Sequence, residues 1–203
     1  MHRNLFRAAT AAAALAALGS AAIPPAAAAA AAARSEAAVA PRAAASLPDY
    51  ATWQSDVREV MDPSVPYLED RVARGGAKLA VVLDIDNTSL ETEYHPGAPN
   101  KPVREFAEAA ASHRVAVLVA TARKQSGRSA ALSALEKAGY PAVTEICLKK
   151  NESHAVDVKI RCRKQFVSEG YTLIANVGNR PGDFEYKNYE RGFKLPDYDG
   201  QLS

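Results

Sequence analysis

Four short apolar runs alternate with helix-like patterns between residues 79 and 179, and this alternation restricts the chain to few folds. The runs are 79–83, 114–123, 141–148 and 171–179. They are nearly continuous in apolar residues, which is typical of strands that are covered on both faces. A short fifth strand is expected at 191–195. The pattern predicts an α/β fold: a Rossmann-like parallel sheet flanked by helices.

Helical periodicity fills the segments between these runs. Two helices are expected before the first strand, and the second of them ends at a glycine pair. A proline opens the helix after the first strand, and single glycines close the two later helices. The expected helices are 50–60, a stretch around 67–72 ending at Gly75-Gly76, one opening at Pro102, 126–138 and 157–170.

Residues 1–46 differ in composition from the rest of the chain. Alanine dominates them, Arg3 and Arg7 give a basic start, and a short apolar stretch is followed by small residues. This is the pattern of a secretory signal peptide, followed by an Ala-rich disordered linker. An exposed alanine-rich helix or a membrane anchor is the alternative. We therefore expect a secreted protein with one domain at 47–203 and no stable membrane association after signal removal.

The charge of that domain is close to balanced. The whole chain has 25 Lys and Arg against 23 Asp and Glu. Four of the arginines and one glutamate lie in residues 1–46, which leaves 21 basic and 22 acidic residues. No basic stripe indicates nucleic acid as a partner. The oligomeric state does not follow from the sequence.

Cys147 and Cys162 are the two cysteines of the chain. Export to an oxidising compartment would allow them to form a disulfide. Two separate buried thiols are the equal alternative, because the sequence does not give the distance between them. Neither cysteine has the neighbours expected of a zinc site.

Polar residues follow three of the apolar runs. Asp84 and Asp86 come directly after the first, Thr121 ends the second, and Asn179 ends the fourth. In parallel sheets ligands bind beyond the carboxyl ends of the strands. We therefore expect these side chains to line one rim of the sheet.

Four motifs in order resemble those of the haloacid dehalogenase (HAD) superfamily of phosphohydrolases. They are "DIDNT" at 84–88, "ATAR" at 120–123, Lys159 in a helix, and "NVGNRPGD" at 176–183. The chain is most similar to the secreted class III acid phosphatases, which include plant vegetative storage proteins. The resemblance extends from about Trp53 to the C-terminus. It implies a HAD-like fold and a phosphomonoesterase of the acid phosphatase type.

The resemblance assigns Asp84 as the nucleophile, which would form an aspartyl-phosphate. Asp86 would protonate the leaving oxygen and later deprotonate water. One group can do both because the steps are sequential. This requires the pKa of Asp86 to lie nearer neutrality, and we expect burial beside another carboxylate to raise it.

The resemblance assigns phosphate binding to residues of the second and third motifs. The Thr121 hydroxyl and the Ala122 backbone N–H would bond phosphoryl oxygens near a helix start, although a strand-end threonine also caps helices. Lys159 would neutralise charge on the nucleophile and the phosphoryl group, unless it is a solvated lysine. Arg123 contacts the substrate or pairs with a surface acid.

The resemblance also implies Mg²⁺, which prefers oxygen ligands. Asp84 would supply a carboxylate oxygen, Asp86 its backbone carbonyl, and the fourth motif the rest. That motif departs from the usual pattern of the superfamily, because Asn179 stands where an aspartate is common. Asp183 is then either a direct ligand or holds a metal-bound water. We expect weaker metal affinity from the uncharged amide.

Residues 89–101 are too few for a separate cap domain, so the pocket is expected to be open to small phosphomonoesters of varied structure. Tyr94 and His95 either form a wall of that pocket or are turn residues packed at its edge. Two rival functions remain. The first is a non-catalytic storage or binding protein, which Asn179 favours. The second is a nucleotidase or phosphotransferase.

Overall fold

Five parallel strands form the central sheet of the computed structural model, which describes residues 46–202. The strand order is β3-β2-β1-β4-β5, which confirms the predicted fold class. The expected signal peptide and nearly all of the expected linker lie outside the described residues. The strands are β1 (Leu79–Leu83), β2 (Ala116–Lys124), β3 (Glu145–Lys149), β4 (Thr172–Gly178) and β5 (Arg191–Lys194).

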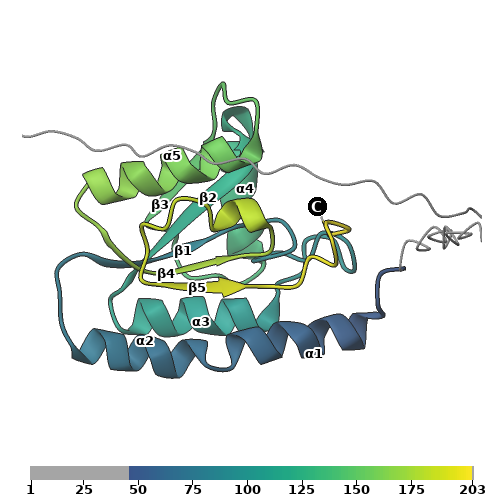
Figure 1. Ribbon diagram of the computed structural model, residues 1–203, viewed down its shortest axis with the longest axis horizontal. Coiled ribbons are helices and arrows are strands. Elements are labelled where there is room, and N and C mark those ends of the chain that lie inside the picture. Colours follow the sequence, from purple (N-terminus) through teal and green to yellow (C-terminus); the bar gives the residue numbers. More distant parts are fainter. Residues whose placement is uncertain (1–45, 203) are drawn as a thin grey trace, which may run out of the picture. The chain divides into compact units, whose positions relative to one another are not determined.

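Helices cover both faces of this sheet (Figure 1). On one face lies α5, and on the other lie α1, α2 and α3. The helices are α1 (Tyr50–Met61), α2 (Ser64–Ala73), α3 (Lys101–Ser112), α4 (Arg128–Lys137) and α5 (Ala155–Ser168), with 3₁₀ turns η1 (Gln125–Gly127) and η2 (Pro181–Asp183).

Alternate side chains of β1 point to opposite faces of the sheet and pack into two separate core clusters. Val81 and Leu83 pack into the larger cluster, with apolar residues of α1 to α4. Ala80 and Val82 point the other way and pack against Val158, Cys162 and Phe166 of α5. This burial on both faces explains why the strand is apolar throughout.

Several boundaries differ from the expected ones, and at β2 and β3 the reasons are local. β3 begins at Glu145 rather than at Pro141, because proline has no N–H to donate to a neighbouring strand. β2 begins at Ala116, since Arg114 (φ 58°) turns the chain after α3. β2 then continues to Lys124, so α4 does not begin until Arg128.

The connections place a crevice beyond the carboxyl ends of β1 and β4. From β1 the chain proceeds outward to β2 and β3, and then returns to form β4 on the other side of β1. Ligands bind at such reversals of strand order in open α/β sheets. The Asp84 N–H donates to the Val177 carbonyl at 3.0 Å, which ties the first residue after β1 to β4.

A tight turn after β1 explains the residues that follow the aspartates. Asn87 takes a left-handed backbone conformation (φ 49°), which asparagine adopts more readily than most residues. Its side-chain oxygen accepts hydrogen bonds from the N–H groups of Thr92 and Glu93, both at 3.0 Å. The Ser89 hydroxyl donates to the Asp84 carbonyl at 2.5 Å. The turn therefore fixes the backbone that carries Asp84.

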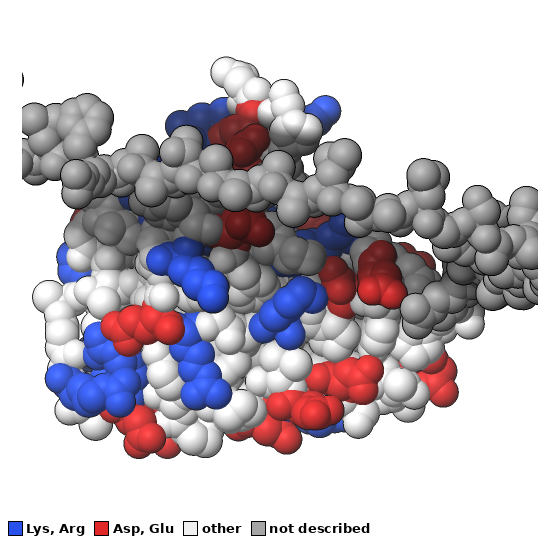
Figure 2. Space-filling model, in the orientation of Figure 1, with Lys and Arg blue, Asp and Glu red and all other residues white. Residues whose placement is uncertain are grey.

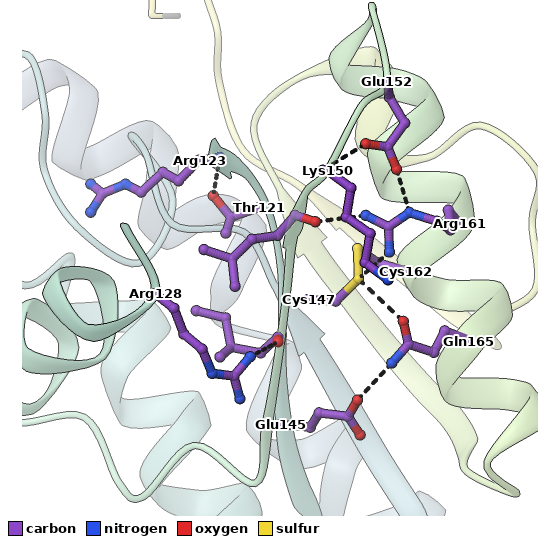
Figure 3. Close-up of a disulfide and its surroundings, with 12 residues drawn as sticks. Thr121, Arg123, Arg128, Glu145, Cys147, Lys150, Glu152, Arg161, Cys162 and Gln165 are labelled. Atoms are coloured by element: carbon purple, nitrogen blue, oxygen red, sulfur yellow. Dashed lines mark hydrogen bonds and ion pairs between the residues drawn. A yellow bond between two sulfur atoms is a disulfide. The ribbon is translucent and has the colours of Figure 1, made fainter. Parts of the chain in front are cut away.

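Cys147 and Cys162 form a disulfide between β3 and α5, which settles the alternative left open by the sequence (Figure 3). Their Cα atoms are 5.5 Å apart. Arg161 adds to this link, because its guanidinium donates to the Leu148 carbonyl at 2.6 Å and pairs with Glu152. The disulfide and Arg161 thus attach the middle of α5 to the sheet.

The face in Figure 2 carries basic and acidic side chains close to one another, in keeping with the nearly balanced charge of residues 47–203. Within residues 46–202, none of the helices combines the length and the apolar character that crossing a membrane requires.

We predict that the disulfide stabilises the fold measurably. The two cysteines are 15 residues apart, and a loop of this length corresponds to roughly 3 kcal/mol in the free energy of unfolding. Urea unfolding of the wild type, with and without reductant, should therefore give a lower midpoint when the bond is open. The double variant Cys147→Ala/Cys162→Ala should lose its sensitivity to reductant. An unchanged midpoint after reduction verified by mass spectrometry would contradict this.

Candidate active site

Lys159 lies between two buried aspartates at the crevice. Its Nζ is 2.5 Å from Asp84 Oδ1 and 2.5 Å from Asp183 Oδ1. The side chains of Asp84, Lys159 and Asp183 are only 9, 7 and 4% exposed. They come from three separate elements: the end of β1, α5 and η2. We call these three residues the charged triad.

The charged triad is electrostatically unbalanced. Burial raises the pKa of Asp84 to about 6; Lys159 opposes this shift and the Asp183 carboxylate adds to it. Burial alone would lower the pKa of Lys159, but the two carboxylates outweigh it and raise the pKa above its ordinary value. With both aspartates ionised, one ammonium faces two carboxylates. The crevice therefore favours a further cation.

The turn from Gly178 to Asp183 holds the third member of the triad. A Cβ atom on Gly178 would lie 2.4 Å from Asp183 Oδ2, so only glycine fits there. The same Oδ2 accepts the Arg180 N–H at 3.0 Å. The Asp183 carbonyl accepts from Asn176 Nδ2 at 3.0 Å and from Arg163 Nη1 at 2.6 Å. Neighbouring groups thus fix both the carboxylate and the backbone carbonyl of Asp183.

Asp86 differs from its expected environment. We expected burial beside a second carboxylate, but its side chain is 34% exposed and pairs with Arg123. Arg123 Nη2 and Nε lie 2.7 and 3.1 Å from the two carboxylate oxygens, and Thr92 donates to one of them at 3.3 Å. The sequence did not show this because Arg123 lies 37 residues away in the chain. Arg123 was expected either to contact the substrate or to pair with an acid, and in the structure it pairs with Asp86.

Thr121 and Ala122 lie side by side but in different surroundings. Ala122 lines the pocket, whereas Thr121 is fully buried inside β2 and does not. The Thr121 hydroxyl accepts the Arg123 N–H at 3.2 Å. Because β2 continues to Lys124, the N-terminus of α4 is not at Thr121, contrary to our expectation.

Asn179 is buried at the pocket and makes contacts at both ends of its amide. Its Nδ2 donates to the Leu202 carbonyl at 2.8 Å, and its Oδ1 accepts from the Thr88 hydroxyl at 3.4 Å. The same hydroxyl is 3.5 Å from Asp84 Oδ2. The amide oxygen therefore faces the side of the crevice where Asp84 lies.

The pocket has a volume of about 330 Å³. Its charged and amide groups share it with small and apolar residues of α5 and of the turn after β4. The residues that line it are Asp84, Asp86, Thr92, Ala122, Ala155, Val156, Lys159, Asn179, Arg180, Gly182 and Asp183. Of the predicted site residues, all except Thr121 are therefore at one pocket.

Tyr94 and His95 are not among these lining residues. The Tyr94 ring stacks on Trp53 with 4.8 Å between the centroids, and its hydroxyl donates to the Pro48 carbonyl. His95 Nδ1 lies 2.8 Å from Glu91. Neither residue forms a wall of the pocket: Tyr94 is a packed turn residue, whereas the His95 side chain is 57% exposed and pairs with Glu91.

A family model now identifies the group to which the chain belongs. The model for the acid phosphatases of HAD superfamily subfamily IIIB matches residues 93–201, more than half of the chain. The chain belongs to this acid phosphatase subfamily. Its enzyme class is that of the phosphoric monoester hydrolases, which confirms the prediction from the motifs. The matched region begins after Asp84 and Asp86 and contains the other predicted site residues.

Solved structures agree with this family in fold. The class C acid phosphatase from Bacillus anthracis is 18% identical, with a TM-score of 0.60 over 75% of this chain and 83% of that one. The same enzyme with tungstate bound is 19% identical, with a TM-score of 0.59 over the same shares. A search of curated proteins gave no match.

Sequence reasoning undervalued several residues around the triad. Arg163 is not among the predicted site residues, yet it is 1% exposed and its guanidinium donates to the carbonyls of Asp183 and Glu185. It lies four residues after Lys159, on the same side of the helix, and this spacing was the available signal. Thr88 and Asn176 belong to motifs that were recognised, but their contacts depend on the folded chain.

We predict that Lys159→Met destabilises the protein at neutral pH. Removing the ammonium leaves two buried carboxylates facing one another, which costs about 3–5 kcal/mol in the free energy of unfolding. Burial already raises the pKa of Asp84 to about 6, and losing Lys159 removes the group that opposes this shift. The penalty should therefore be largest above pH 6 and shrink as the pH falls and Asp84 takes up a proton.

Urea unfolding between pH 4 and 8 measures this penalty. Lys164→Met is the matched control, because Lys164 lies on the same helix and is exposed. Equal stabilities of the two variants at pH 7 would contradict the importance of the triad.

Proposed function

We propose that this protein is a secreted, Mg²⁺-dependent phosphomonoesterase that acts through an aspartyl-phosphate on Asp84. One observation carries the proposal: in a chain of an acid phosphatase subfamily, the aspartate that directly follows β1 is held by a buried lysine at the open end of the sheet. Phosphoryl transfer requires a placed nucleophile and positive charge around the phosphoryl oxygens. The crevice offers both.

The chemistry divides into two displacements at phosphorus. Asp84 attacks through Oδ2, the oxygen not held by Lys159, and the bond from phosphorus to the ester oxygen breaks. Asp86 supplies the proton that the leaving alkoxide needs, and then accepts a proton from the water that cleaves the aspartyl-phosphate. Free Asp84, phosphate and the alcohol result. During the reaction the Asp86 carboxyl must therefore leave Arg123 and contact the leaving oxygen of the substrate.

Binding of the phosphoryl group is assigned to the remaining predicted residues. Lys159 neutralises charge as the phosphoryl group transfers, and the Ala122 N–H donates to one of its oxygens. We keep Thr121 in this group, although its hydroxyl must turn from the Arg123 N–H to reach the pocket. A phosphate in contact with these groups would satisfy donors on β2 and α5 together.

The donor set at the pocket fits Mg²⁺. No group of three acidic, histidine or cysteine side chains forms a metal cluster within the described residues, but amide and carbonyl oxygens also bind this ion. Asp84 and Asp183 already share one cation, Lys159. Asp84, Asp183, Asn179 and the Asp86 carbonyl would hold Mg²⁺. When bound, it supplies positive charge that offsets the repulsion between the carboxylates and the phosphate.

Small phosphomonoesters are the proposed substrates. A pocket of about 330 Å³ with Ala122, Ala155 and Val156 in its walls accommodates a phosphate and a modest leaving group. A panel of sugar, aryl and nucleoside phosphates, with alcohols as competing acceptors, separates a general phosphatase from a nucleotidase or a phosphotransferase.

Secretion is supported by the leader-like composition of residues 1–46 and by the disulfide, since such bonds persist mainly outside the cytosol. N-terminal sequencing of the protein recovered from the medium would reveal the cleavage site. An intact Met1 on a cell-retained protein would contradict export.

We predict that Asp84→Asn abolishes hydrolysis of p-nitrophenyl phosphate while the protein stays folded. An amide cannot form the aspartyl-phosphate, so kcat should fall by more than about a thousandfold, with circular dichroism unchanged. In the wild type, a chelator should suppress turnover and excess Mg²⁺ should restore it.

Glu93→Gln is the matched control for Asp84→Asn. It removes one carboxylate from the same loop, and Glu93 is not among the residues that line the pocket. Its activity should equal that of the wild type. Full activity of folded Asp84→Asn would refute the nucleophile, and activity that no chelator affects would remove the metal from the mechanism. A folded wild type without phosphatase activity would favour the storage or binding protein.

A further inference from the structure

Residues 197–202 form a turn that closes over Asn179. Leu202 is fully buried in the larger core cluster, and its N–H donates to the Asp197 carbonyl at 3.1 Å. The Arg180 guanidinium donates to the Gly200 carbonyl at 2.9 Å. The Tyr198 hydroxyl donates to Asp56 of α1 at 2.7 Å. The turn is therefore attached to the domain at several points.

The backbone of this turn is unusual. Tyr198 and Asp199 both have positive φ angles, 47° and 56°, and Gly200 follows at 86°. Residues with side chains adopt this region at a cost, so such conformations persist where the surroundings fix them. Here they direct the Leu202 carbonyl toward Asn179, whose Nδ2 donates to it at 2.8 Å.

A backbone carbonyl can only accept a hydrogen bond. The contact with Leu202 therefore requires the NH₂ end of the residue 179 amide, and it leaves the oxygen end to face Thr88 and the pocket. A carboxylate at position 179 would place two acceptors 2.8 Å apart without a proton between them. Burying such an unpaired charged group is costly.

We propose that the 197–202 turn is a positioning element for Asn179, and that the Leu202 carbonyl is the reason an amide is required at position 179. The turn fixes which end of the amide faces the pocket. This inference rests on the proposed function only in taking that pocket as the reaction site. Asn179 then departs from the usual aspartate because of its contact with Leu202, without any loss of catalysis being implied.

A double-mutant cycle between Leu202→Ala and Asn179→Ala tests the proposal. Leu202→Ala should lower kcat/KM for p-nitrophenyl phosphate by about tenfold, the usual scale for a residue that orients a ligand through its outer shell. In the Asn179→Ala background the same change should have less than about a twofold effect, because the amide to be positioned is gone. Independent, multiplicative losses would overturn the proposal.

The control is Leu68→Ala, another fully buried leucine, which lies in α2 and is not among the residues that line the pocket. It should lower stability to a similar degree but leave kcat/KM unchanged at temperatures where every variant is folded. A comparable loss of activity in Leu68→Ala would mean that Leu202 affects activity only through stability, and it would overturn the proposal. If Leu202→Ala does not fold, Leu202→Val gives a milder change at the same position.

Hydrogen exchange of the Asn179 side-chain NH₂, followed by NMR without substrate or metal, gives a readout that does not depend on activity. The protons should be protected in the wild type and in Leu68→Ala, and should exchange faster in Leu202→Ala. Unchanged exchange in Leu202→Ala would overturn the proposal even if the enzyme is active. If the wild type shows protection but hydrolyses no phosphomonoester, the proposed function fails while the positioning stands.

Asn179→Asp tests the preference for an amide. It should lower both the melting temperature and kcat/KM, although it restores the aspartate usual in the superfamily. The damage should be smaller in the Leu202→Ala background, where the carbonyl is no longer held in place. An Asn179→Asp protein as stable and as active as the wild type would overturn this part of the inference.

Discussion

The buried ion pair interactions of Lys159 with Asp84 and Asp183 are the constraint on which the rest of the structure depends. Charges at this depth are tolerated only when they are paired, and the pairing here joins three elements that are distant in the chain. Each of these elements is secured separately: the turn after β1 by Asn87, the middle of α5 by the disulfide, and the turn after β4 by Arg163 and Asn176. These contacts hold one lysine between two acids.

The same arrangement connects the sheet topology with the chemistry. The strand order reverses between β1 and β4, which are neighbours in the sheet. At the carboxyl ends of both strands the polypeptide leaves the sheet at the crevice. Asp84 and Asn179 follow these two strands directly, so neither needs a long loop to reach the pocket. This short connection favours rigid placement of the proposed nucleophile, which phosphoryl transfer requires. Membership of an acid phosphatase subfamily agrees with that design.

Local pattern predicted the elements well where burial decides the structure. β1 lies at the expected residues because all five of its side chains are apolar and its neighbours cover both faces. The strand ends predicted the position of Asp84, and the resemblance to the superfamily motifs implied that Lys159 and Asp183 lie near it. Long-range polar contacts could not be predicted in this way. Asp86 pairs with Arg123, and Asn179 with Leu202, through contacts that no local spacing specifies. The predicted run at 114–123 already extended past Thr121, and β2 ends one residue later, at Lys124.

The most direct measurement of the central claim is chemical trapping of the reaction at Asp84. Borohydride reduces an aspartyl-phosphate to homoserine, so protein quenched during turnover of a phosphomonoester and treated in this way can be digested and analysed by mass spectrometry. The account predicts homoserine at position 84, and none there when substrate is omitted. Steady turnover with an unmodified Asp84, or with the modification at another aspartate, would contradict it.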